Sequence, residues 1–135
     1  MMVPRAHTFR KMERVTGRTL VEKLFKGGVS RSMSSYPLRA VYCLKERVDG
    51  EAPVRILVSV PKRCFKRAVR RNRVKRQVRE AYRTNKQLLD NCMAQQQQQT
   101  LMVAFIWQGD QLYDTAEVER KMQSLLVRMG EKICQ

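Results

Sequence analysis

The side chains best suited to chemistry in this sequence are the cations of one central segment. Between Lys62 and Lys86 the chain carries 12 Lys and Arg residues and a single acid, Glu80. Guanidinium groups form paired hydrogen bonds with phosphates and stack on bases, and the Asn72 amide can hydrogen-bond to a base edge or a sugar hydroxyl. An ordinary solvated helix face mixes charges of both signs. The segment therefore predicts a polyanionic partner, with nucleic acid the first candidate.

Groups that could carry out catalysis are scarce. The only histidine, His7, lies near the chain end, and no Ser/His/Asp or Cys/His set can be assembled around it. The acids do not cluster as a metal-dependent nuclease would need. We therefore expect no catalytic residue and no dedicated metal or cofactor site in this chain.

The cysteines lack a metal-binding pattern. They are Cys43, Cys64, Cys92 and Cys134, at spacings of 21, 28 and 42 residues, with no CxxC or Cys/His pair. Cys43 lies in an apolar run, where a buried thiol is the ordinary interpretation. We expect free, reduced thiols in a cytoplasmic protein.

The composition of the whole chain indicates a folded protein. Its 135 residues carry a formal net charge of +16, yet residues 87–135 hold four basic and six acidic side chains. An apolar fraction of 43% supports a core, and the length fits one domain, residues 1–135, with a flexible tail over about residues 1–12. No apolar run approaches the ~20 residues that span a bilayer, and no signal peptide is recognisable.

Three strands are predicted from apolar patterning. Period-two alternation predicts strands over 38–45 and 54–60, and the Asp49-Gly50 turn between them indicates an antiparallel hairpin. The nearly continuous apolar run over 101–107 predicts a strand covered on both faces.

Helices are predicted around these strands. Helical spacing and capping patterns predict a short helix over about 19–25 and a final helix that begins near Asp114 and ends at Gly130. The Gln95–Gln99 run predicts a mobile loop over about 92–99. Together with a long basic helix, the order is α-β-β-α-β-α, which indicates an α+β fold with helices packed on a small sheet.

The basic helix is expected over about 69–89 and has two distinct faces. At ~100° per residue, its apolar side chains share one face and its cations the opposite arc. The first face holds Val74, Val78, Ala81, Tyr82, Asn85, Leu88 and Leu89, and the second holds Asn72, Lys75, Arg76, Arg79, Arg83 and Lys86. The apolar face should dock on the sheet, leaving a stripe of positive charge in solvent. Neutralising phosphates with such a stripe releases counterions, which makes binding salt-dependent.

Two aromatic residues have two possible roles. If the first helix packs across the sheet edge, Phe25 and Tyr42 could line a cleft beside the basic helix and stack on single-stranded nucleic acid. The alternative is that both are core residues. The residues alone leave both interpretations open.

The central motifs resemble those of a known family, the protein subunit of bacterial ribonuclease P. The resemblance is carried by Val58-Ser59-Val60-Pro61-Lys62-Arg63, by residues 68–76 around Arg71-Asn72-Arg73, and by Arg79-Glu80-Ala81-Tyr82-Arg83. Weaker matches at Arg14-Val15 and Phe25-Lys26-Gly27-Gly28 extend it from about Phe9 to Met129.

The resemblance implies a fold, an activity and partners. The fold would be like the second domain of ribosomal protein S5, with a left-handed βαβ crossover that carries the basic helix. The family's protein binds a catalytic RNA and the 5′ leader of precursor tRNA, and assists the endonucleolytic removal of that leader. Catalysis would belong to the RNA, Mg²⁺ would act through the RNA, and no membrane or protein partner would be required.

The resemblance also assigns residues to RNA contact. By position, the RNA-binding side chains are Lys62, Arg63, Arg71, Asn72, Arg73, Lys75, Arg76 and Arg79, to which the charge pattern adds Arg67, Arg70 and Arg83. The leader cleft would be lined by Val21, Phe25, Ala40 and Tyr42. Three features depart from the family: Val21 stands where an aromatic is common, the loop Cys64–Arg67 lacks the usual glycine and is one residue longer, and the Gln95–Gln99 run is not a family feature.

Two other functions are compatible with the charge alone. A structural RNA-binding protein, such as a ribosomal protein, would also be basic and α+β, although the specific motif argues against it. A basic amphipathic protein at an anionic membrane surface would show a similar helix, although two apolar strands and capped helices indicate a folded core. The RNA that copurifies, or a preference for anionic vesicles over RNA, would separate the three.

Overall fold

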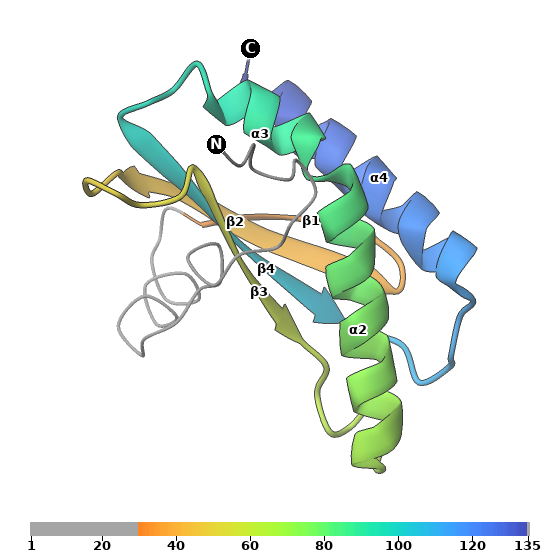
Figure 1. The fold of residues 1–135 in the computed structure, drawn as a ribbon. Helices are drawn as coiled ribbons and strands as arrows, with labels where there is room; N and C mark the ends of the chain where they lie inside the picture. Colours follow the sequence, from red (N-terminus) through yellow and green to blue (C-terminus); the bar gives the residue numbers. More distant parts are fainter. Residues whose placement is uncertain (1–29, 135) are drawn as a thin grey trace, which may run out of the picture.

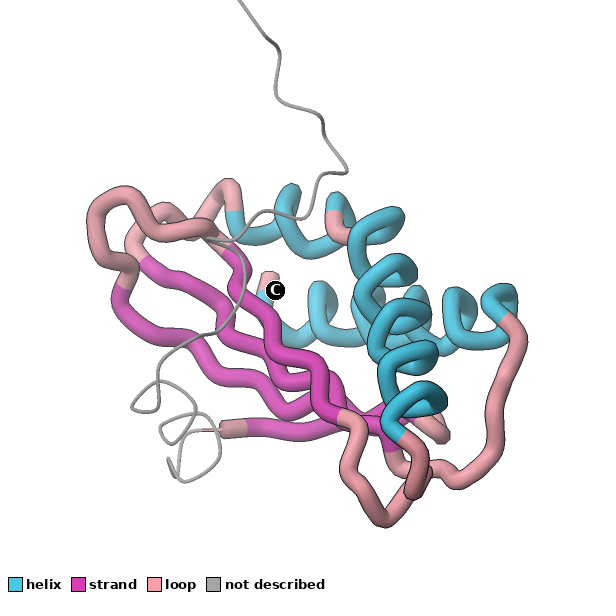
Figure 2. The backbone as a smooth tube through the Cα atoms, turned by 60° about the horizontal axis from the view of Figure 1, so that its bottom comes forward, coloured by secondary structure: helices cyan, strands magenta, loops and turns pink. Residues whose placement is uncertain are grey.

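One mixed sheet forms the fold, and the helices that the structure describes lie on one of its faces (Figure 1). The computed structural model describes residues 30–134. Its elements are β1 (Arg31–Ser35), β2 (Leu38–Glu46), β3 (Val54–Ser59), α2 (Ala68–Asn85), α3 (Gln87–Met93), β4 (Gln99–Trp107) and α4 (Thr115–Ile133). The predicted tail and first helix, with Val21 and Phe25, lie outside the described residues. From a second direction, the three described helices again lie on one side of the strands (Figure 2).

The sheet has the order β1-β2-β4-β3, which corrects the predicted hairpin. β4 lies between the two strands that we expected to pair, antiparallel to β2 and parallel to β3. The physical reason is burial, because the almost wholly apolar β4 loses most contact with water at the centre of the sheet. The parallel β3 and β4 are joined through α2 and α3, so the basic helix belongs to a βαβ crossover.

Glu51 fixes the connection between β2 and β3. Its carboxylate accepts hydrogen bonds from Lys45 Nζ (2.6 Å), Arg55 Nη1 (3.0 Å) and Thr100 Oγ1 (3.3 Å), and from the backbone N–H of Val48 (3.1 Å). Burial raises the pKa of the Glu51 carboxyl, but the hydrogen bonds, that of Lys45 first, leave its pKa below the usual value. The carboxylate therefore ties together three strands, with Thr100 of β4 between its partners from β2 and β3.

The first strand, β1, was not predicted. Its sequence Arg-Ser-Met-Ser-Ser contains one apolar residue, Met33, and so carries no clear alternation. It pairs antiparallel with β2 as an edge strand, from Arg31 opposite Tyr42 to Ser35 opposite Leu38. A short polar strand of this kind is typical of a sheet edge.

The helical bounds differ from the prediction in two places. The basic helix ends at Asn85, and a separate helix α3 begins at Gln87, which leaves Leu88 43% exposed rather than buried. α4 continues past Gly130 to Ile133, because contacts between its last residues and the end of α3, described below, hold its final turn.

The glutamine run is shorter as a loop than predicted. Cys92 and Met93 belong to α3, and Gln99 begins β4. Arg47 holds the turn between them, since its backbone N–H donates to Gln98 O (2.8 Å) and its Nη2 to Gln99 O (2.7 Å) and Gln96 O (3.2 Å).

The main core lies between the sheet and the helices. From α2 it receives Val74, Val78, Ala81 and Tyr82, and from α4 Val118, Met122, Leu125, Leu126 and Met129. The Tyr82 ring packs 5.9 Å from that of Phe105 on β4, measured between centroids. The predicted apolar face of the basic helix is thus confirmed through Tyr82, and its burial turns the opposite arc toward solvent.

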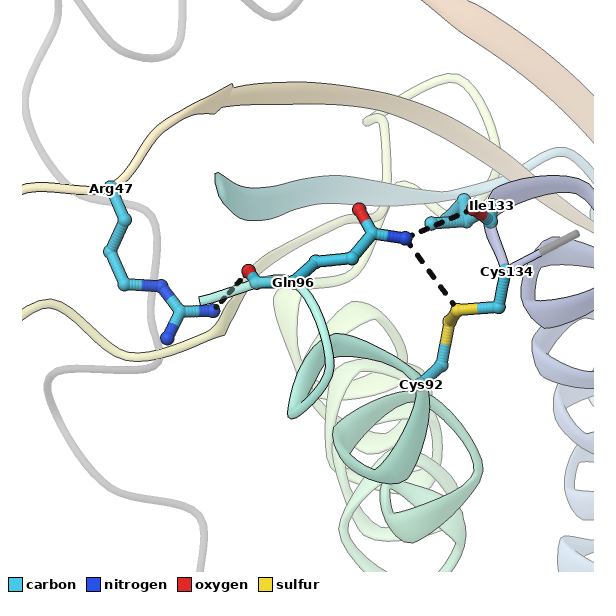
Figure 3. Close-up of a disulfide and its surroundings, with 5 residues drawn as sticks. All are labelled: Arg47, Cys92, Gln96, Ile133 and Cys134. Atoms are coloured by element: carbon cyan, nitrogen blue, oxygen red, sulfur yellow. Dashed lines mark hydrogen bonds between the residues drawn. A yellow bond between two sulfur atoms is a disulfide. The ribbon is translucent and has the colours of Figure 1, made fainter. Parts of the chain in front are cut away.

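A disulfide joins α3 to the end of α4, which corrects the prediction of four reduced thiols. Cys92 and Cys134 are linked with their Cα atoms 5.9 Å apart, within the ordinary range for a disulfide (Figure 3). Cys43 and Cys64 are buried thiols outside this bond. The pairing could not be read from the sequence, because 42 residues separate two cysteines that only the packing of α3 on α4 brings together.

Reduction of this disulfide should lower the free energy of unfolding by about 2–4 kcal/mol, because the cross-link closes a long loop in the unfolded chain. Urea unfolding with and without dithiothreitol measures the difference. The double variant Cys92→Ser/Cys134→Ser is the control and should not respond to the reductant. Equal midpoints for the oxidised and reduced wild-type protein would contradict the prediction.

Candidate nucleic-acid interface

The outward arc of α2 displays an exposed row of polar and cationic side chains. Arg70, Asn72, Arg73, Arg76 and Arg79 are exposed, and Lys75 is half-buried. Their positions follow from the helical period, because burying Val74 and Val78 in the core directs these residues away from it. We call this row, with Lys62, Arg63 and Arg67 before the helix, the basic stripe.

The basic stripe has no partners within the described part of the chain. None of its nine side chains forms a hydrogen bond or ion pair with a residue of 30–134. A row of like charges without counter-charges repels itself and lowers the stability of the free protein. A ligand that supplies regularly spaced negative charge would remove this repulsion.

Two predicted RNA contacts have other roles in the free protein. Arg71 is half-buried, and its Nη1 donates to Phe65 O (2.8 Å) and Lys66 O (2.9 Å), so it holds the loop that precedes the helix. Arg83 pairs with Glu80 through Nη2 and Oε1 at 2.5 Å. The Arg83 hydrogen bond and its charge lower the pKa of Glu80, the single acid of the segment.

The loop Cys64–Arg67, which precedes α2, is held in place by its buried residues. Cys64 and Phe65 are buried, and Cys64 Sγ lies 3.5 Å from Trp107 O at the end of β4. Lys66 and Arg67 remain exposed. The loop thus presents cations at the start of α2 on a backbone that is fixed from the core side.

The N-terminus of α2 favours an anion. Arg67 at the N-cap makes no side-chain capping bond, and the first turn contains no acidic residue. The first amide groups of a helix lack intrahelical acceptors and lie at the positive end of the helix dipole. Phosphate bound there would satisfy these donors as well as the cations of the basic stripe.

Both predicted leader-cleft residues on β2 belong to the main core, but only Tyr42 also lines a cavity. Ala40 is fully buried in the main core, so its methyl group is not available to a bound strand in this structure. Tyr42 is 5% exposed and also belongs to the core. It lines two cavities of about 350 and 640 Å³ where β1, β2 and the end of α4 meet, which we call the Tyr42 pocket.

Sequence reasoning missed the cations of the Tyr42 pocket. Both cavities are lined by Arg31 and Lys132, and the larger also by Arg128 and Glu131. Arg128 Nη2 donates to Ser34 O (2.8 Å), which ties α4 to the edge strand. The spacing of Arg128 and Lys132, four residues apart on a helix, places them on one side and was the available signal.

Residues 30–134 offer neither a group of metal ligands nor a helix that could span a membrane. Within residues 30–134, no group of three or more His, Cys, Asp or Glu side chains is arranged to hold a metal ion. No helix in that range is long and apolar enough to cross a bilayer.

Comparisons with known proteins agree with this arrangement. The family model for Ribonuclease P matches residues 9–130. The chain is 41% identical over 133 residues to a protein of Porphyromonas gingivalis named ribonuclease P protein component, covering 98% of this chain and 94% of that protein. A protein of the same name from Chlorobaculum tepidum is 36% identical over 92 residues, covering 67% of this chain and 58% of that protein.

Solved structures show the same fold at lower identity. The ribonuclease P protein of Thermotoga maritima superimposes with a TM-score of 0.64 at 23% identity, covering 86% of this chain and 96% of that one. That of Staphylococcus aureus gives a TM-score of 0.60 at 18% identity, with coverage of 95% and 96%. With a family match over most of its length and a close relative that spans nearly all of it, the chain belongs to the ribonuclease P protein family.

Proposed function

We propose that this chain is the protein component of a ribonuclease P ribonucleoprotein. It binds the catalytic RNA through the basic stripe, binds the 5′ leader of precursor tRNA, and assists the cleavage that gives the mature 5′ end. The observation that carries this proposal is the row of cations on α2 without partners in the described chain, set within the family's motif.

The chemistry is assigned to the RNA. The described residues offer a binding surface, with no cluster suited to a metal ion. Mg²⁺ would be bound by the RNA and would supply the activated water and stabilise the leaving oxygen. The protein works where precursor tRNA is made, which in a bacterium is the cytoplasm.

The basic stripe would bind by releasing counterions from the RNA backbone. Each phosphate neutralised frees condensed cations, which drives association and makes it sensitive to salt. Arg73 and Arg76 lie on the exposed arc without partners in the described chain, so their guanidinium groups are available for paired phosphate contacts. The amide of the neighbouring Asn72 can accept and donate, which suits a base edge or a 2′-hydroxyl.

We assign the leader to the Tyr42 pocket. Arg31, Arg128 and Lys132 outnumber the single acid Glu131 there, so the pocket suits a phosphodiester chain. Tyr42 is too buried to receive a stacked base over its whole ring, and forms the floor of the pocket instead. In this assignment the cations hold the leader phosphates while Tyr42 shapes the space between them.

Substituting Arg73→Ala or Arg76→Ala should weaken binding of the catalytic RNA and reduce the slope of log K against log salt by about one unit, because each removes one phosphate contact. Filter binding at several salt concentrations measures the slope. The matched control is Arg120→Ala, which removes an exposed arginine of α4 that pairs with Glu117. An unchanged slope for both α2 variants would remove α2 from the interface.

Substituting Lys132→Ala should weaken binding of precursor tRNA to the assembled holoenzyme about 3- to 10-fold and leave mature tRNA unaffected, because the contact is to the leader. Lys121→Ala, earlier on α4 and outside the pocket lining, is the control. Equal losses for precursor and mature tRNA would contradict the assignment of the leader to this pocket.

Reconstitution tests the function itself. The protein, mixed with the catalytic RNA at moderate magnesium, should raise the rate of 5′ leader removal above that of the RNA alone, because it supplies affinity for both the RNA and the leader. Gel analysis of labelled precursor tRNA measures the rate. The absence of stimulation at saturating protein would overturn the proposed function.

A further inference from the structure

We propose that Cys92 and Cys134 form a thiol–disulfide switch that sets the affinity of the Tyr42 pocket for the leader. The inference rests on the proposed function. In the disulfide form the end of α4 is held against α3, and Lys132 is fixed at the pocket. In the dithiol form this end is released and leader affinity falls.

The disulfide lies directly beside the pocket wall. Cys134 is the C-terminal cap of α4, and the two residues before it, Lys132 and Ile133, line the smaller cavity together with Tyr42. The bond joins this end of α4 to Cys92 on α3, which packs against it (Figure 3). The position of Lys132 therefore depends on a covalent tie two residues away.

The disulfide is the covalent link between the last turn of α4 and α3, and weaker contacts act beside it. Gln96 Nε2 donates to Ile133 O (3.1 Å), and the carbonyl of Gln96 is in turn held by Arg47 Nη2 (3.2 Å) (Figure 3). Within the helix, the Cys134 N–H donates to Gly130 O (2.9 Å). Once the disulfide is broken, the end of α4 is held by the Gln96 side chain, which also lies 3.9 Å from Cys134 Sγ, and by the partial packing of Ile133 on the core. These contacts are weaker than a covalent bond, and helix ends held only by such contacts fray.

The disulfide is accessible to small thiols. Cys134 is exposed and Cys92 is half-buried, whereas the thiols of Cys43 and Cys64 are buried. In a reducing compartment, disulfides are rare, and those that form are usually transient or redox-sensing. A small thiol can therefore reach the Cys92–Cys134 pair, which lies beside the pocket, more easily than it can reach the buried thiols of Cys43 and Cys64.

The reaction is ordinary thiol–disulfide exchange with glutathione. A glutathione thiolate attacks one sulfur of the pair, the S–S bond breaks, and the displaced cysteine takes up a proton. A second glutathione attacks the mixed disulfide and releases the other cysteine thiol. Two electrons and two protons pass to the protein, and glutathione disulfide is the oxidised product; the reverse reaction closes the switch.

The test compares the holoenzyme in two redox states. The full-length protein is oxidised with glutathione disulfide or reduced with dithiothreitol, assembled with the catalytic RNA, and titrated with precursor and mature tRNA. Thiol counting establishes the state of each sample, and circular dichroism checks that both are folded at the assay temperature. We expect reduction to lower precursor affinity about 3- to 10-fold, with the affinities for mature tRNA and for the catalytic RNA unchanged.

Variants locate the effect. Cys92→Ser and Cys134→Ser should each bind precursor tRNA as the reduced protein does and should not respond to dithiothreitol. Lys132→Ala should abolish the difference between the redox states, a result that a general loss of stability would not produce.

The outcomes separate the switch from the proposed function. Equal precursor affinity in both redox states, with precursor still preferred over mature tRNA, overturns the switch and leaves the proposed function standing. A redox response that persists in Cys92→Ser, or failure of the disulfide to form, also overturns the switch. Loss of the preference for precursor tRNA in both states overturns the leader assignment together with the switch.

Discussion

The packing of one face of α2 into the core determines the rest of this structure. Val74, Val78, Ala81 and Tyr82 are buried in the core that α2 shares with the sheet and α4, and this burial fixes the rotation of the helix about its axis. Because the helical period is fixed, the opposite arc can point only into solvent. A hydrophobic contact thereby arranges a row of cations that would otherwise avoid one another, and the sheet behind them keeps the row rigid for a structured RNA.

Local patterns predicted more than long-range ones. The basic helix, its buried face and the central apolar strand were predicted, because each depends on a period of a few residues. The insertion of β4 between β2 and β3 was missed. A turn signal such as Asp49-Gly50 indicates that two strands follow each other in the sequence, but it does not show whether another strand lies between them in the sheet. The Cys92–Cys134 bond was also missed, because it joins two cysteines that are far apart in the sequence. The prediction that all four thiols are reduced was therefore wrong.

The candidate site likewise has a part that the sequence predicts and a part that only the fold assembles. The stripe on α2 could be predicted because its residues are consecutive on one element, whereas the Tyr42 pocket joins an edge strand, a central strand and the end of α4. Arg31 and Lys132 are about a hundred positions apart, and only the fold places them on one pocket. Arg71 illustrates a further limit, because its position in the motif predicts an RNA contact while its guanidinium holds the loop before the helix.

We infer that the basic stripe, whose side chains have no partners among residues 30–134, is satisfied by RNA phosphates. The most direct test is the free energy of unfolding of the RNA-free protein, measured by urea denaturation as NaCl rises from about 0.05 to 0.5 M, where screening becomes strong. We predict that stability increases with salt, and increases less in an Arg73→Gln/Arg76→Gln variant that already lacks part of the repulsion. A stability that decreases with salt, or an identical salt response in the variant, would contradict it.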